Sequence, residues 1–415
     1  MLSTHKNKID IAYVFIFYIG FQGGKYFLQN RIQEVGFAVI LCLFFYGAIK
    51  LALQRASIKW QWWFWCVPIV ISYPMIISSV MYYLNTGSNV MYSFFATREF
   101  LILFLSPTIY FLYKLGYPIE RLEKVIVFSL VIAVINYLFF YLTLDLPSMA
   151  LGGDEYMAKQ VVWDPWRGYR LKAPSAALIV ATCYCLIMLI KKNDFVIKVG
   201  VFIFFGLVIF IWSLLMARTQ MASLFLSIII YVLFFMRPKS LNILMLVMPI
   251  ILVVIGVMAS SVIEFFFIED HTRAKSFNIA LQVIREHPIF GFGTASWKGI
   301  TYQSIFGKTF YPSDIGFIGI FFKYGIVGGI LYLVFIFYLL VRIVKANWCF
   351  TLYYKYSNPL LVSFVLWDLL ITFNVLLIPT LVFTPGMMMA AIIIGLTACY
   401  RDKYSKVNNS KTKLV

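Results

Sequence analysis

Residues 198–216 read KVGVFIFFGLVIFIWSLLM, an apolar run whose only charge stands at its first position. A helix needs about 20 apolar residues to cross the hydrocarbon core of a bilayer. Similar runs recur along the whole chain, which is 62% hydrophobic and 13% charged, whereas soluble proteins carry about 25% charged residues. We therefore predict an all-α polytopic membrane protein in which residues 1–415 form one integral domain.

The apolar runs predict about twelve transmembrane helices. The first run lacks a small-residue cleavage site, so we interpret it as a retained helix rather than a signal peptide. The predicted spans lie near residues 10–29, 35–53, 61–83, 98–115, 124–145, 172–190, 198–216, 219–236, 240–262, 324–343, 358–378 and 381–399.

The lysine and arginine residues are distributed unevenly between the two ends of these spans. With a cytoplasmic N-terminus, most of the 35 basic residues fall in cytoplasmic connections and the tail, and most of the 17 acidic residues fall outside. The positive-inside rule therefore predicts that both termini are cytoplasmic. Since the basic residues are spread over short connections and do not share one face, they argue against nucleic-acid binding.

Two outer connections, residues 146–171 and 261–312, are longer and richer in charge than the others. Loops of this length are uncommon unless they are functional or disordered, and these two are too aromatic for disorder. Residues 273–287 alternate apolar and polar positions at helical spacing, and Pro288 follows them. This pattern predicts an amphipathic helix that lies at the outer surface.

The chain has six cysteines and three histidines. The cysteines fall in or beside apolar runs, without the spacing of a zinc or redox motif. We interpret them as small buried hydrophobic residues, and we predict neither a metal site nor a cofactor.

The second outer connection carries the most informative motif. Residues 272–297 read TRAKSFNIALQVIREHPIFGFGTASW, a helical pattern that ends in His-Pro and is followed by Gly-Phe-Gly. Residues 313–328 read SDIGFIGIFFKYGIVG and lead directly into a predicted span. In this order and on one side, the two stretches resemble the C-terminal region of the bacterial O-antigen polymerase and ligase superfamily. Arg218 followed by Thr219, and Arg170 before Pro174, extend the resemblance upstream.

The resemblance implies a GT-C-like polymerase or ligase fold in the bacterial inner membrane. It also implies a donor glycan carried on a polyprenyl diphosphate. Arginine suits a diphosphate leaving group, because its planar guanidinium binds phosphate oxygens in pairs and stays charged. We expect Arg170, Arg218 and Arg273 to contact the diphosphate, and since these cations would neutralise it, we expect no metal ion.

The acceptor is a sugar hydroxyl, which needs a general base. At the position of Asp314 the ligases of this family typically carry a histidine, so the aspartate here favours a polymerase. Asp314, His287, Asp154 and Glu155 are the candidate bases. The tryptophans and tyrosines of the first outer connection are candidates for stacking on sugar rings.

Several of these residues also have purely structural interpretations. Arg218 can extend from a span end to the lipid headgroups, and His287 can shape the turn before its proline. Asp368 falls in the middle of a predicted span, where an acid usually faces a partner or a cavity. We predict that it pairs with a basic residue of another span, Lys323 or Arg98.

The function predicted from these patterns is polymerisation of lipid-linked repeat units into O-antigen, capsule or exopolysaccharide. One alternative is a ligase that moves the finished glycan to another acceptor. Others are a flippase for lipid-linked oligosaccharides and a small-solute transporter. The expected partners are the lipid-linked oligosaccharide and membrane lipids, with a chain-length regulator and a flippase as further candidates.

Overall fold

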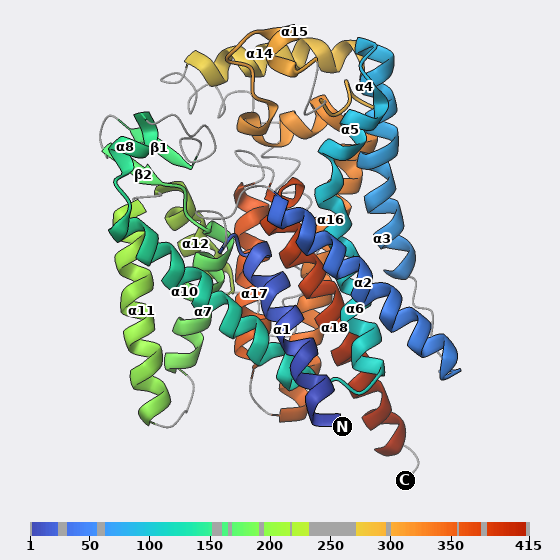
Figure 1. Ribbon diagram of the computed structural model, residues 1–415, viewed down its shortest axis with the longest axis vertical. Helices are drawn as coiled ribbons and strands as arrows, with labels where there is room; N and C mark the ends of the chain where they lie inside the picture. The colour runs from blue at the N-terminus through green and yellow to red at the C-terminus, as the bar shows by residue number, and fades with distance from the viewer. Residues whose placement is uncertain are drawn as a thin grey trace.

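The computed structural model describes residues 2–23, 31–55, 63–151, 160–164, 168–190, 195–215, 218–231, 271–295, 300–354, 357–374 and 380–411. The helices form a bundle, with the first residues of α1 and the last of α18 at one end and the β1–β2 hairpin and α14 at the other (Figure 1). We name these the terminal end and the outer end. The helices of the first half are α1 (Leu2–Gly20), α2 (Arg31–Leu53), α3 (Trp63–Ser72), η1 (Tyr73–Ile77), α4 (Ser78–Thr86), α5 (Val90–Ala96), η2 (Arg98–Phe104), α6 (Leu105–Lys114), α7 (Ile119–Thr143) and α8 (Leu146–Leu151).

The remaining elements begin with the strands β1 (Val161–Asp164) and β2 (Gly168–Leu171). They continue with α10 (Ser175–Ile190), α11 (Phe195–Leu215), α12 (Arg218–Ile230), α14 (His271–Glu286), α15 (Tyr302–Phe306), η5 (Pro312–Ile315), α16 (Gly316–Tyr354), α17 (Pro359–Asn374), η6 (Thr380–Val382) and α18 (Thr384–Lys411). The all-α prediction is confirmed apart from this small hairpin, and the helix predicted over residues 273–287 is present as α14.

Among the residues that the structure describes, five helical segments are long and apolar enough to cross a membrane, or six if the pair Val90–Ala96 and Arg98–Lys114, bent by 50°, counts as one span. The chain is therefore a multi-pass membrane protein. Eleven of the twelve predicted ranges overlap helical segments, and the range 240–262 lies outside the described residues. The number twelve itself stays a prediction.

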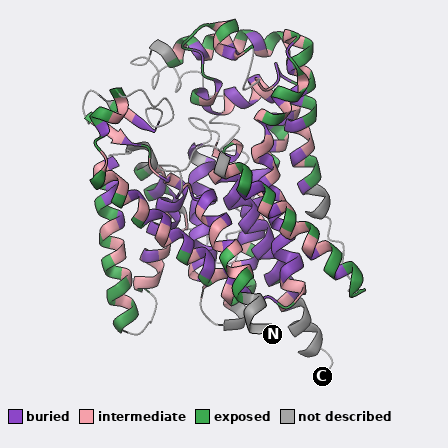
Figure 2. Cartoon of the chain, viewed as in Figure 1, coloured by how far each residue is buried: buried purple, intermediate pink, exposed green. Residues whose placement is uncertain are grey.

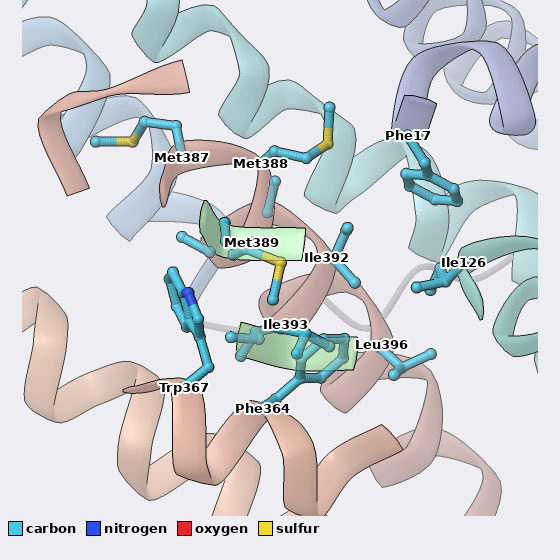
Figure 3. Close-up of a cluster of buried hydrophobic side chains, with 14 of the residues drawn as sticks. Phe17, Ile126, Phe364, Trp367, Met387, Met388, Met389, Ile392, Ile393 and Leu396 are labelled. Carbon is cyan, nitrogen blue, oxygen red and sulfur yellow. The ribbon is translucent and has the colours of Figure 1, made fainter. Parts of the chain in front are cut away.

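The core is centred on α17 and α18. Figure 2 shows most of the residues of these two helices in purple, the colour of buried residues. Met389 and Ile393 of α18 lie beside Trp367 and Phe364 of α17 in Figure 3, and all four side chains are buried. Helices that are apolar on every side suit either this interior or contact with lipid. The apolar residues exposed along α11 fit the second environment.

A break in α16 shapes the outer half of the bundle. At Gly325 the backbone leaves helical geometry, with φ 64° and ψ −169°. This conformation is open only to glycine. The break frees backbone groups on both sides, which must find other partners in an apolar setting.

The turn that follows α14 supplies those partners. The N–H groups of Phe292 and Gly293 donate to the carbonyls of Phe322 and Lys323 at 2.7 and 3.0 Å. In return, the carbonyl of Pro288 accepts the N–H of Ile326 at 2.9 Å. The Gly-Phe-Gly stretch and the glycine-rich entry to α16 are thus two halves of one backbone junction.

The outer connection beyond α14 is a packed lobe rather than a loose loop. A small core fills it, separate from the main core of the bundle. Phe322 of α16 and Tyr82 of α4 contribute aromatic rings from two helices, and Phe292 stacks on Phe322 with centroids 5.7 Å apart. The lobe is therefore held to the bundle by both hydrogen bonds and apolar packing.

Ion pairs join the helices at the terminal end. Asp10 of α1 accepts the Nε of Arg121 of α7 at 2.7 and 2.9 Å. Lys114 of α6 pairs with Asp402 of α18 at 2.7 Å. These contacts link the first helix and the last helix to the middle of the chain.

We expect Gly325→Ala to destabilise the protein strongly. A Cβ there would lie 2.2 Å from the carbonyl oxygen of Ile289, and the backbone strain alone costs about 1–3 kcal/mol. The thermal unfolding midpoint of the protein in detergent, followed by size-exclusion chromatography of heated samples, should fall by many degrees. Gly206→Ala is the control, because a Cβ at Gly206 meets no atom within 4 Å. Equal unfolding midpoints for Gly325→Ala and Gly206→Ala would show that the junction at Gly325 does not stabilise the protein.

Candidate functional site

The β1–β2 hairpin presents two basic side chains on one face. Arg170 and Lys172 are two residues apart in an extended segment, so they point to the same side. The carbonyl of Leu171 between them accepts the hydroxyl of Tyr137 of α7 at 3.2 Å. The N–H of Lys172 donates to Gln160 at 2.8 Å and extends the pairing. Because the hairpin is tied to α7, the positions of both cations are defined by the bundle.

Both cations line a cavity of about 550 Å³ at the outer end. The wall includes residues from the ends of α1, α11 and α17 and from the beginnings of α10 and α18. Arg170 also donates to the carbonyl of Leu215, the last residue of α11, at 3.4 Å. Trp367 and Leu370 of α17 form an apolar part of the wall. Both are buried, whereas Lys172 is exposed, so the apolar part lies deeper than the cations. The cavity therefore joins a cationic rim to an apolar floor.

The first turns of two helices also face this space. Ser175 and Ala176 begin α10, and Pro385 and Gly386 lie in the first turn of α18; all four line the cavity. A helix N-terminus carries partial positive charge and free N–H groups. Arg170, Lys172 and two helix N-termini make the cavity a suitable site for an anion, with phosphate groups as a good match.

A chain of alternating charges extends from the cavity into the lobe. Asp314 in η5 is exposed, and its charge interacts with those of Lys172 and of Lys323 in α16. Lys323 interacts in turn with Glu99, whose Oε2 accepts the N–H of Thr384 at 2.9 Å. Because Thr384 is the first residue of α18, Glu99 both caps this helix and belongs to the series of alternating charges.

The protein environment alters the pKa of Lys172. The residue precedes the first turn of α10 and is exposed. Removal of part of its hydration by neighbouring atoms lowers its pKa from 10.5, and the charge of Asp314 opposes the change. Lys172 was absent from the residues predicted to form the site. The alternation Arg170-Leu171-Lys172 was the only sequence signal for it.

The other predicted diphosphate ligands occupy different places. Arg218 is the first residue of α12, and its side chain lies outside what the structure describes. In the same helix Ser223 donates to Asn374, which lines the cavity, at 2.7 Å. Five residues of helix span about 8 Å, so Arg218 begins a helix that borders the cavity. Arg273 is exposed on α14 and is not among the described residues that line the cavity.

The structure places the four predicted general bases in different environments. Asp314 lies within electrostatic range of the cavity lysine. His287 directly follows α14, and its ring packs edge-to-face on Phe292 with centroids 5.6 Å apart while its carbonyl accepts the N–H of Gly291. These contacts fit the turn-forming interpretation of His287. Asp154 and Glu155 lie outside the described residues. Within the described part of the chain, no group of three or more His, Cys, Asp and Glu side chains could hold a metal ion.

The prediction for Asp368 is wrong in its partner. Both carboxylate oxygens are fully buried and make no hydrogen bond with a described residue. Arg98 instead pairs with Glu34 at 3.4 Å, and Lys323 interacts with Glu99. Both cations therefore have other acidic partners, and neither pairs with Asp368.

No protein-family model matches this chain, and a search of functionally characterised proteins finds no match either. The cavity, its charges and its position in the bundle are therefore the basis on which a function can be assigned.

The lowered pKa of Lys172 predicts a pH dependence of anion binding. A lysine with a lowered pKa loses its charge at a lower pH than usual, so its attraction for an anion is complete near neutral pH and is lost as the pH rises. We expect Lys172→Arg to bind inorganic pyrophosphate as wild type does at pH 7 and progressively better than wild type toward pH 10. Isothermal titration calorimetry on the purified proteins measures the pyrophosphate affinity of wild type and of Lys172→Arg at each pH. If the two affinities changed with pH in the same way, the role of Lys172 would be contradicted.

Proposed function

We propose that this protein is a polysaccharide polymerase that joins oligosaccharide units carried on polyprenyl diphosphate at the outer face of the membrane. The observation that supports this most is the cavity with Arg170 and Lys172 on its rim and apolar residues on its floor. A lipid-linked glycan has the same order of parts, because its diphosphate lies between an apolar tail and a polar sugar chain.

The donor would bind with its diphosphate beside the two cations and the first turns of α10 and α18. Arginine contacts phosphate oxygens in pairs, and lysine adds a compact charge. The sugar units would extend past the hairpin, where Trp163 is 61% exposed and offers an indole face for stacking. The polyprenyl tail would remain among the apolar helices.

The transfer itself needs a base for the acceptor and stabilisation for the leaving group. Asp314 would accept the proton of the acceptor hydroxyl, whose oxygen then forms the new bond to the anomeric carbon of the donor. The bond from that carbon to the diphosphate oxygen breaks, and the electron pair leaves with the diphosphate. Arg170 and Lys172 would stabilise the developing charge, since fixed charges need no rearrangement during the reaction.

A second candidate function is transport of a lipid-linked oligosaccharide or a small solute across the membrane. The observation that favours it is Asp368, a carboxylate buried in α17 without a hydrogen-bond partner among the described residues. Ionisable groups in membrane-embedded helices are costly and often mark transport pathways. The charged residues that the structure describes lie mostly at the two ends of the bundle rather than along its middle, which makes this the weaker candidate.

We expect Arg170→Ala and Lys172→Ala to shorten the surface glycan in the host. Loss of one fixed charge at the leaving group should slow transfer by about 10²–10³-fold, so single repeat units should accumulate on the outer leaflet. Gel electrophoresis of the extracted glycan reports the chain length in a deletion strain complemented with each variant.

Arg401→Ala is the matched control, because Arg401 is exposed near the end of α18, away from the cavity. Repeat units trapped on the inner leaflet of the deletion strain would indicate a flippase, and full-length chains without an acceptor would indicate a ligase. Normal chain length in well-expressed Arg170→Ala and Lys172→Ala variants would refute the proposed site.

A further inference from the structure

A second cavity, of about 650 Å³, lies at the terminal end of the bundle. Its wall includes the first turns of α7 and α17 and a part of α18. It is separate from the outer cavity and shares no lining residue with it. The proposed polymerase reaction makes no use of it.

A rigidly held carboxylate stands in this cavity. Oε1 of Glu123 accepts the hydroxyl of Tyr400 at 2.5 Å and the Nδ2 of Asn358 at 2.7 Å. Asn358 is itself fixed, because its Oδ1 accepts the N–H groups of Leu360 and Leu361 at the start of α17. No hydrogen bond from a described residue reaches Oε2, so one oxygen is anchored and the other is left for a donor from a ligand.

Aromatic rings and basic groups surround that carboxylate. Tyr184 and Phe350 line the cavity with Tyr400. A carboxylate beside aromatic faces is a favourable environment for an ammonium group. Lys403 at the same cavity is already paired with Glu120 at 2.5 Å, so Lys124 is the lysine that would meet an anionic group of the same ligand. The charges therefore complement a zwitterion.

The apolar part of the cavity continues onto an exposed apolar face of α7. Lys124, Phe128 and Val131 line it at helical spacing on α7, so they share one face of that helix. Phe128 is 55% exposed, and Ile135 and Phe139 continue the same exposed apolar face toward the outer end. An amphiphile could place its headgroup in the cavity and its acyl chains along this face.

We propose that the cavity binds a phospholipid with a phosphoethanolamine headgroup. The primary ammonium donates to Oε2 of Glu123, and the phosphate lies against Lys124. A primary ammonium fits better than a group without N–H, because the free carboxylate oxygen needs a hydrogen-bond donor.

Native mass spectrometry of the full chain tests the site. Delipidated protein is mixed with equal amounts of phosphatidylethanolamine and phosphatidylglycerol that have the same acyl chains. We expect wild type to retain the ethanolamine lipid severalfold more, and Glu123→Gln to lose this preference. Asp145→Asn, an exposed carboxylate beyond the other end of α7, should keep it.

Lys124→Ala covers the case in which Glu123→Gln fails to fold, because Lys124 is exposed and its removal leaves the bonds of Glu123 intact. This variant should retain severalfold less ethanolamine lipid at an unchanged melting temperature. Equal or greater retention of phosphatidylglycerol by wild type, or an unchanged preference in folded Glu123→Gln, overturns the proposal. Unchanged retention by Lys124→Ala does so as well.

Discussion

The outer half of this bundle depends on one backbone junction, the break in α16 at Gly325 and the turn from Pro288 to Gly293 that fills it. Non-helical backbone is tolerated at membrane depth only where protein satisfies its polar groups. Here the hydrogen bonds run in both directions between the two segments, and the hydroxyl of Tyr73 donates to the carbonyl of Tyr324 at 2.8 Å. Tyr73 begins the π-helical turn η1, so an irregular turn of a third segment supports the same junction. Lys323, next to the break, is thereby directed at Asp314 and Glu99 rather than at lipid.

The helices were predictable from the sequence because span length and apolar composition follow directly from bilayer thickness. The amphipathic helix α14 was predictable as well, since its buried Ala280 and Val283 stand at helical spacing. The β1–β2 hairpin was not, because its four-residue strands are too short for a clear period-two pattern. The bends were also hidden: the predicted span 324–343 begins beside Gly325, but only the contact with residues 288–293 gives Gly325 its conformation.

The site was predictable in part, and the reason lies in the range of the interactions. Arg170 was singled out through its place before a helix start, but Lys172 reaches the cavity only because the unpredicted hairpin positions it beside Arg170. Asp368 shows the opposite error. Its position in an apolar helix suggested a partner, yet Arg98 and Lys323 are held at the outer end by Glu34 and Glu99. Pairing between helices depends on tertiary geometry that composition does not contain.

The contact between Arg170 and Leu215 links the cavity to the surrounding bilayer. Leu215 is the last residue of α11, and many of the apolar side chains along that helix, such as Phe202, are exposed. A helix with so little protein around it adjusts its tilt to the hydrocarbon thickness. Since its final carbonyl accepts from Arg170, a thinner or thicker membrane moves the acceptor of this guanidinium. We therefore expect a change in lipid composition to shift the position of Arg170 at the cavity.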